Sequence, residues 1–150
     1  MSTKIQWVQN NDGSQGETWN PIVGCSKISE GCRNCYAERM AKRLKAMGLP
    51  QYQEVVDENG WTGYMAYAHD VLFQPDKWKK PRMIFVGSMN DLFHPSIPAH
   101  RIQAVMAIIA TSRRHTFQIL TKRADRMAEY FSENPVPDNV WLGVTAENQQ

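Results

Sequence analysis

The chain has 150 residues, 42% of them hydrophobic and 21% charged, with a formal net charge of +2. This composition is typical of one globular domain over residues 1–150, and the small net charge neither requires nor excludes a polyanionic partner. No apolar run approaches the roughly 18 residues that span a membrane, and the N-terminus lacks the apolar stretch of a signal peptide, so we expect a cytoplasmic protein without membrane contact.

The first predicted elements are short. Lys4–Val8 has the composition of a β-strand, and residues 10–16 are rich in turn-forming side chains. All the cysteines of the chain follow, as Cys25, Cys32 and Cys35. The residues between them are mostly polar or glycine, which predicts an exposed loop that wraps around a bound group.

Three clustered thiols indicate metal or redox chemistry, because an odd number of cysteines does not make a disulfide framework. A structural zinc site or a simple iron–sulfur cube takes four protein ligands, so three leave one position open. The spacing alone therefore leaves a zinc site completed by a histidine, a three-thiol cluster and unliganded thiols as alternatives. His94 is the best histidine for zinc, because it lies in a loop that follows a predicted strand.

A helix is predicted to leave the cysteine loop. Its apolar stripe consists of Tyr36, Met40, Leu44 and Met47. Residues 51–81 have no clean period and carry many aromatic side chains, so we expect an irregular insertion that covers a site. Lys77–Arg82 is either a phosphate-contacting patch or an exposed basic turn, and the turn is the simpler interpretation.

Three apolar runs predict strands that are buried on both faces. These runs are Met83–Gly87, Thr116–Leu120 and Val140–Val144. Helical patterns from Ala99 to Arg113 and from Arg123 to Ser132 alternate with them, which indicates an α/β fold. With the cysteine-bearing unit we count about four βα units, so we expect a partial (βα) barrel that is the N-terminal half of a longer one. The alternative is that the last strand leaves an open edge through which the chain self-associates.

Several motifs agree in order and spacing with one known superfamily. They are the run Asn20-Pro21-x-x-Gly24-Cys25, the run Gly31-Cys32-x-x-Cys35-Tyr36-Ala37-x-Arg39, the segment Phe85-Val86-Gly87-Ser88 with Asp91 and Pro95, and the segment Ile119-Leu120-Thr121-Lys122. Together they resemble radical S-adenosylmethionine enzymes, and among these the subgroup similar to spore photoproduct lyase. The cysteine segment is also similar to a phage-associated family of three-cysteine-motif proteins. The first cysteine gap is six residues, where most of the superfamily has three.

The resemblance implies a partial barrel of the radical S-adenosylmethionine type in which Cys25, Cys32 and Cys35 bind three irons of a [4Fe-4S] cluster. S-adenosylmethionine would chelate the fourth iron, and an electron donor would drive its reductive cleavage to start radical chemistry. The substrate is not identified, although the relation to a DNA-repair lyase suggests a nucleic acid. Residues placed to bind the cofactor are Gly87, Ser88, Asn90, Asp91, Lys122 and Thr145, with Asn148 as a weaker candidate. For Asn90 and Asp91, capping of the next helix is the alternative role and the simpler one. No catalytic side chain is identified. The alternative function is a non-enzymatic Cys3His zinc-stabilised binding module.

Overall fold

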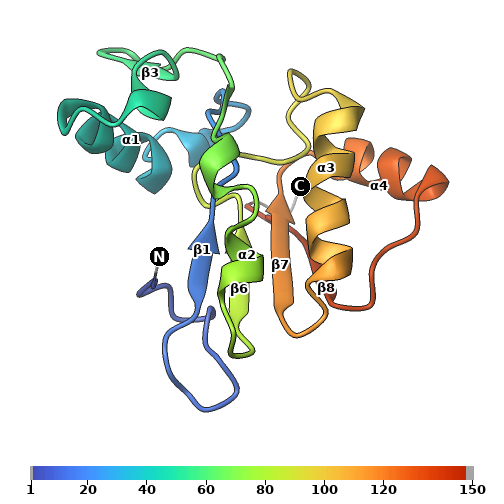
Figure 1. Ribbon diagram of the computed structural model, residues 1–150. Helices are drawn as coiled ribbons and strands as arrows, with labels where there is room; N and C mark the ends of the chain where they lie inside the picture. Colours follow the sequence, from blue (N-terminus) through green and yellow to red (C-terminus); the bar gives the residue numbers. More distant parts are fainter. Residues whose placement is uncertain (1, 148–150) are drawn as a thin grey trace.

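Four parallel strands form the central sheet of the computed structural model, which describes residues 2–147 (Figure 1). They are β1 (Glu17–Trp19), β6 (Met83–Val86), β7 (Thr116–Thr121) and β8 (Val140–Val144). Their order in the sheet, β1-β6-β7-β8, follows their order in the chain. Because all four run in one direction, their carboxyl ends meet at the same edge of the sheet, which lies uppermost in Figure 1. The predicted α/β class is therefore confirmed.

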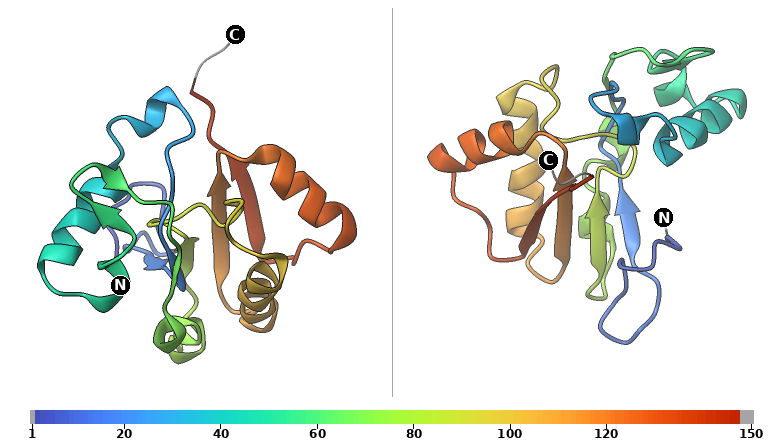
Figure 2. Two further views of the ribbon diagram at one scale, coloured as in Figure 1. Left: turned by 90° about the horizontal axis from the view of Figure 1, so that it is seen from above. Right: turned by 180° about the vertical axis from the view of Figure 1, so that it is seen from behind.

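Two helices cover one face of this sheet, α3 (Ala99–Thr111) and α4 (Ala124–Glu133) (Figure 2). The larger hydrophobic core lies between these helices and the strands. Its members include Trp19, Ile84, Val86, Ile102, Val105, Ile109, Phe117 and Ile119. No helix in residues 2–147 has the length and apolar content needed to cross a membrane.

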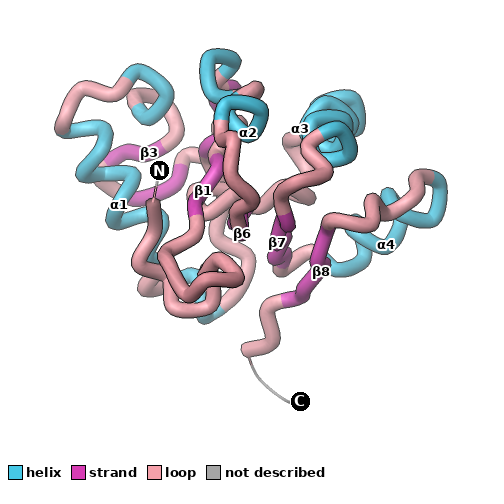
Figure 3. The backbone as a smooth tube through the Cα atoms, turned by 60° about the horizontal axis from the view of Figure 1, so that its bottom comes forward, coloured by secondary structure: helices cyan, strands magenta, loops and turns pink. Residues whose placement is uncertain are grey.

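A second, smaller core holds α1 (Tyr36–Ala46) against the insertion, beside β1 and away from α3 and α4 (Figure 3). The helix has its predicted place, but its predicted stripe is only half right. Met40 and Leu44 pack against this core, whereas Tyr36 and Met47 are exposed. The most buried apolar residue of the helix is Ala41, which is a member of this core.

The insertion contains more order than its sequence indicates. Its elements are η2 (Pro50–Tyr52), β3 (Val56–Asp57), β4 (Gly60–Trp61), β5 (Ala66–Tyr67), η3 (His69–Val71) and α2 (Gln74–Lys77). Strands β3 and β4 form a hairpin, and β5 pairs with β2 (Ile22–Val23), which directly follows β1. This second pairing joins the insertion to the start of the cysteine loop.

The predicted strand at Lys4–Val8 is wrong, because the chain turns there. Val8 is fully buried, and its carbonyl accepts a hydrogen bond from the Gly16 amide instead of pairing in the central sheet. The first strand of the sheet is β1, which follows the turn-rich residues 10–16 and was not predicted as a strand. Burial on both faces is also wrong for β8, since Trp141 and Val144 are about half exposed. Strand β8 lies at an edge of the described sheet, and self-association through it stays a prediction.

Candidate functional site

An open pocket of about 210 Å³, here called the cysteine pocket, lies at the carboxyl edge of the sheet. Around it stand all three cysteines and all six predicted cofactor-binding residues: Cys25, Cys32, Cys35, Gly87, Ser88, Asn90, Asp91, Lys122 and Thr145. The cysteines come from the segment after β1, and the other residues come from the ends of β6, β7 and β8. Asn148, the weaker candidate, lies outside the described residues. Trp61 of the β4 strand also lines the pocket, as expected of an insertion that covers a site.

The three cysteines are free thiols with different settings. Cys32 ends the short helix η1 (Glu30–Cys32) and is buried, whereas Cys25 and Cys35 are half-buried and Cys35 directly precedes α1. Between residues 2 and 147, no three His, Cys, Asp or Glu side chains are grouped closely enough to hold a metal ion. The loop therefore directs three thiols to one pocket without setting them at coordination distance, so a bound metal or cluster would have to draw the loop together.

Asn20 joins the loop after β1 to the loop after β6. Its side-chain amide donates to the Ser88 hydroxyl at 2.9 Å, and its side-chain oxygen accepts from the Met89 amide at 3.0 Å. The Gly24 amide donates to the Met89 carbonyl at 3.1 Å, one residue before Cys25. The Asn20 position of the cysteine motif thus fixes the two loops to each other.

Gly87 makes the pocket wall by adopting a backbone conformation that other residues avoid. Its φ is +76°, and a Cβ atom there would lie 2.2 Å from the side-chain oxygen of Asn90. That Asn90 oxygen is buried and has no hydrogen-bond partner in the described chain. A buried acceptor of this kind favours a bound donor, because leaving it unpaired costs about 1–3 kcal/mol.

The Asp91 carboxylate, only 6% exposed, connects the loop after β6 to the end of β7. It accepts hydrogen bonds from the Thr121 hydroxyl at 2.6 Å and from the Phe93 amide at 3.0 Å. Its second oxygen accepts from the Lys122 amide and the Arg123 guanidinium, each at 3.0 Å. Asp91 was predicted to contact the cofactor, but in this structure both of its oxygens are engaged by the protein.

His94 holds the cysteine loop in place through Ser26. Its Nδ1 accepts from the Ser96 amide at 3.0 Å, so the neutral ring carries its proton on Nε2 and donates to the Ser26 hydroxyl at 2.6 Å. Burial and the nearby Arg123 lower the pKa of His94, which favours this neutral form. Both ring nitrogens are therefore engaged, and none of the four histidines lines the cysteine pocket. This geometry opposes the predicted role of His94 as a zinc ligand.

Lys122 and Glu147 form a polar cluster over Cys32. The Glu147 carboxylate accepts from the Lys122 ammonium, from the Ser29 hydroxyl at 2.9 Å and from the Gly31 amide at 3.1 Å. The Lys122 ammonium also lies 3.5 Å from the Cys32 sulfur. A Cβ atom on Gly31 would lie 2.3 Å from the Glu147 carboxylate, so a larger residue directly before Cys32 would require the Glu147 side chain to shift.

This arrangement separates the acidities of two of the thiols. Burial raises the pKa of Cys25, and the nearby Arg123 offsets only part of that effect. Burial also acts to raise the pKa of Cys32, but hydrogen bonds from the Ile28–Ser29 segment and the charge of Lys122 outweigh it, so the pKa of Cys32 is lowered. Cys32 is therefore the thiol that ionises more readily, and the thiolate is the form that binds metals.

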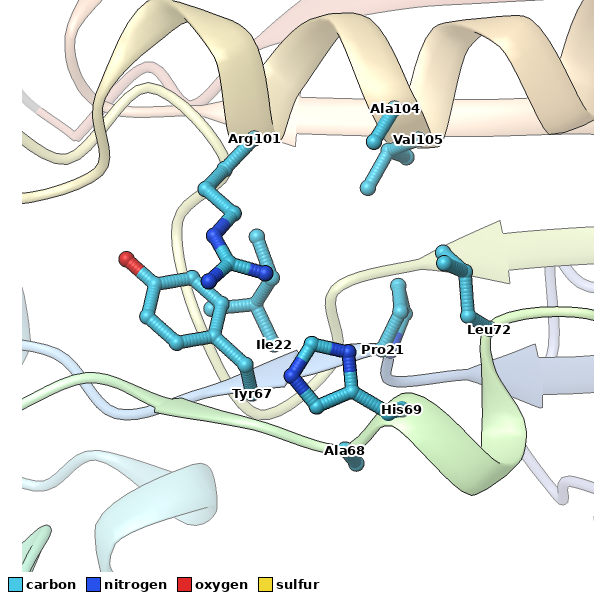
Figure 4. A pocket seen from close by; sticks show the side chains of 9 residues that line it. All are labelled: Pro21, Ile22, Tyr67, Ala68, His69, Leu72, Arg101, Ala104 and Val105. Atoms are coloured by element: carbon cyan, nitrogen blue, oxygen red, sulfur yellow. The ribbon is translucent and has the colours of Figure 1, made fainter.

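The sequence analysis missed Ser26, Arg123 and Glu147. Arg123 was predicted only as the start of a helix, and its partners Asp91 and Ser26 are 32 and 97 residues away in the chain. A small hollow elsewhere lies between the β2–β5 pair and α3, where the Arg101 guanidinium stacks on the Tyr67 ring at 4.1 Å (Figure 4). At about 20 Å³ it has room for about one water molecule.

The fold and the site define an α/β protein with a cysteine-lined pocket at the carboxyl edge of a parallel sheet. Residues 2–150 match the family described as a protein of unknown function, DUF5131, and the chain belongs to this family. Neither a search of curated proteins nor a search of solved structures returned a match.

Proposed function

We propose that this chain is a radical S-adenosylmethionine-type protein that holds a [4Fe-4S] cluster and cleaves S-adenosylmethionine reductively. One observation supports the proposal above the others. The three motif cysteines and the residues matched to cofactor contacts lie far apart in the sequence, yet they surround one pocket. A purely structural cysteine loop would not require polar residues from the ends of three other strands around it.

The residues present fit the cluster and its cofactor by their chemistry. Cys25, Cys32 and Cys35 are reduced thiols on one pocket, and as three thiolates they would hold three irons and leave one open. The unpaired Asn90 oxygen beside Gly87 is an acceptor suited to an ammonium group such as the methionyl amine. The cluster, when bound, supplies the electron that cleaves the cofactor's sulfonium bond to give a radical.

The chain's own residues would bind and orient S-adenosylmethionine in the pocket. Lys122 carries a positive charge at the end of β7 and already holds a carboxylate, that of Glu147, which is the same chemistry as the carboxylate of S-adenosylmethionine. Gly87 lets the Asn90 side-chain oxygen approach the backbone at the end of β6, which keeps that acceptor in the pocket wall. Apolar side chains of Ile28, Trp61 and Leu120 line the pocket and would exclude water from it.

The proposed architecture is a partial (βα) barrel. Sequential parallel strands with α3 and α4 on one face are what a barrel segment requires. The other face carries half-exposed Trp141 from β8 and the Trp7 ring, which packs 4.7 Å from Phe85. We place the substrate on this face, next to the cysteine pocket, and the reaction needs an external electron donor as partner.

The zinc-stabilised binding module is the other function that the sequence allows. It requires a fourth ligand at the cysteines, and the engaged nitrogens of His94 oppose it. A zinc module would also give no reason for the unpaired oxygen of Asn90 in the pocket wall.

Anaerobic reconstitution with iron and sulfide tests the proposal. We expect about four irons per chain with visible absorbance of a cluster, loss of the cluster in Cys25→Ala, Cys32→Ala and Cys35→Ala, and an intact cluster in His94→Ala. The proposal is contradicted if the purified chain holds one tightly bound zinc and His94→Ala loses it as completely as Cys32→Ala. Ser14→Ala, far from the pocket, serves as the control for the effect of mutation alone.

A further inference from the structure

A second pocket, of about 260 Å³, lies at the opposite end of the sheet, where the strands begin. We call it the basic pocket. Arginines from two separate turns line it: Arg82, directly before β6, and Arg114, two residues before β7. The rest of the polar wall consists of Asn10, Asn11, Asp12 and Thr116. The sequence pattern favoured an exposed basic turn at Lys77–Arg82, but the fold brings that turn against a second basic turn.

Positive charge is concentrated around this pocket. Lys79 and Lys80 precede Arg82, Arg113 precedes Arg114, and these neighbours are exposed. Within residues 2–147, the two lysines and the two arginines of the second turn form no ion pair, whereas Arg82 is paired with Glu17 at 2.9 Å. Even with the Asp12 carboxylate nearby, these four positive charges without an ion pair are a local excess in a chain whose net charge is only +2.

One acidic residue lies in the wall, and it is turned toward its own loop. The Asp12 carboxylate accepts from the Ser14 amide at 2.9 Å and from the Ser14 hydroxyl at 2.5 Å. These bonds, together with the charge of nearby Lys80, lower the pKa of Asp12. The carboxylate therefore stays ionised and offsets one of the positive charges.

The arginines are held before any ligand arrives. The Arg114 guanidinium donates to the Trp78 carbonyl at 3.2 Å, and the Arg82 guanidinium lies 6.0 Å from the Trp78 ring. The Arg82 amide donates to Nδ1 of the fully buried His115 at 3.1 Å, which fixes the start of β6. The Arg82 Nε is buried without a hydrogen-bond partner in the described part of the chain. Fixed guanidinium groups suit planar recognition of phosphate oxygens.

We propose that the basic pocket binds a phosphate group, with Arg114 of its wall and Lys80, which directly precedes the lining Pro81, as the charged contacts. Asn11 and Thr116 serve as neutral donors. This site is separate from the cysteine pocket and does not depend on its function. A phosphate could come from a small phosphorylated compound or from the backbone of a nucleic acid. Both share the chemistry that the pocket recognises, and the experiment separates them.

The test uses the whole chain, a fluorescein-labelled single-stranded DNA of about 20 nucleotides, and inorganic phosphate. Lys80→Ala/Arg114→Ala should weaken DNA binding more than about 10-fold. It should also reduce the slope of log K against log salt concentration by about 1.4, the value for two lost phosphate contacts on a single strand. The control, Arg39→Ala/Arg43→Ala, removes the same charge from the exposed face of α1 and should change binding less than about 2-fold. Millimolar inorganic phosphate should compete in the wild type.

A second variant keeps the test independent of lost side-chain packing. Asn11→Asp adds a carboxylate to an exposed part of the wall and should weaken both probes while melting at the wild-type temperature. A much higher affinity for DNA than for inorganic phosphate assigns the site to a nucleic-acid backbone. A similar affinity for the two probes assigns it to a small phosphorylated compound. The inference is overturned if neither probe binds, or if the pocket and control double variants weaken binding equally.

Discussion

At the scale of single residues, the shape of the cysteine pocket depends on side chains that join loops from different strands. Asp91 is the clearest case, because one buried carboxylate serves four donors from the ends of β6 and β7. Glu147 does the same for the cysteine loop, which it joins to Lys122. Such residues decide whether the pocket keeps its shape when it is empty.

Asp91→Asn should destabilise the protein strongly. The change removes the charge that pairs with Arg123 in a buried setting, where losing one partner costs about 3–5 kcal/mol. Urea unfolding followed by circular dichroism measures the loss. Glu129→Gln, on the exposed side of α4, should stay within about 0.5 kcal/mol of the wild type. A loss below about 1 kcal/mol for Asp91→Asn would show that the Asp91 bonds do not hold the two loops.

Glu147→Ala should loosen the cysteine loop without unfolding the domain. The Gly31 amide and the Ser29 hydroxyl would lose their acceptor, and Lys122 would lose its partner. Hydrogen exchange measured by NMR should be several-fold faster at the Gly31 amide and unchanged at amides in β7. Glu133→Ala, at the end of α4, provides the matched control. Equal exchange at the Gly31 amide in both variants would show that Glu147 does not hold the cysteine loop.

At the scale of elements, two buried histidines tie segments together in their neutral form. His94 holds the cysteine loop, and Nε2 of His115 donates to the Pro75 carbonyl of α2 at 2.8 Å. Burial lowers the pKa of both rings, and neighbouring arginines lower it further. An unfolded chain takes up protons at these rings below about pH 6.5, at which the folded rings stay neutral.

Stability should therefore be complete above about pH 6.5 and fall as the pH drops toward the folded pKa values. Each ring contributes a slope of up to about 1.4 kcal/mol per pH unit in that window. His115→Gln should lower stability at pH 7 but flatten this slope, whereas the exposed His100→Gln should leave it unchanged. Urea titrations at pH 5 to 8 measure the slope, and an equal slope in wild type and His115→Gln would contradict the assignment.

The elements that the sequence predicted best are those with local signals. Apolar runs and helical periods located β6, β7, β8, α3 and α4 to within a few residues. Strand β1 was not predicted, because it is only three residues long and contains the acidic Glu17. The burial of Glu17 depends on Arg82, which lies 65 residues further along the chain. The pairing of β2 with β5 was not predicted either, because no local pattern indicates that residues 22 and 67 pair.

In the candidate site, too, the features with local signals could be predicted and the long-range contacts could not. The cysteines and the polar strand ends could be predicted, because clustering and position after an apolar run are visible in the sequence. The bonds from Ser26 to His94 and from Glu147 to Lys122 could not, because each joins segments whose approach is set by the packed sheet. The distance between the thiols was not predictable either, since it depends on how the loop orders without a bound group.

At the scale of the whole molecule, the sheet separates two polar ends. The cysteine pocket occupies the edge where the strands finish, and the basic pocket occupies the edge where they begin. The first is the place where parallel α/β proteins bind the ligand they act on. The second offers a positively charged surface that could hold a larger phosphorylated molecule while its reacting part reaches the open face.

The most direct test of the central claim is cofactor cleavage. Reconstituted protein reduced with dithionite should convert S-adenosylmethionine to 5′-deoxyadenosine and methionine in equal amounts, detected by liquid chromatography, and Cys32→Ala should form neither. Lys122→Ala should retain its cluster but bind S-adenosylmethionine at least about 10-fold more weakly, because a charged contact to the carboxylate is lost. A cluster-loaded wild type that forms no more 5′-deoxyadenosine than Cys32→Ala would contradict the proposed function.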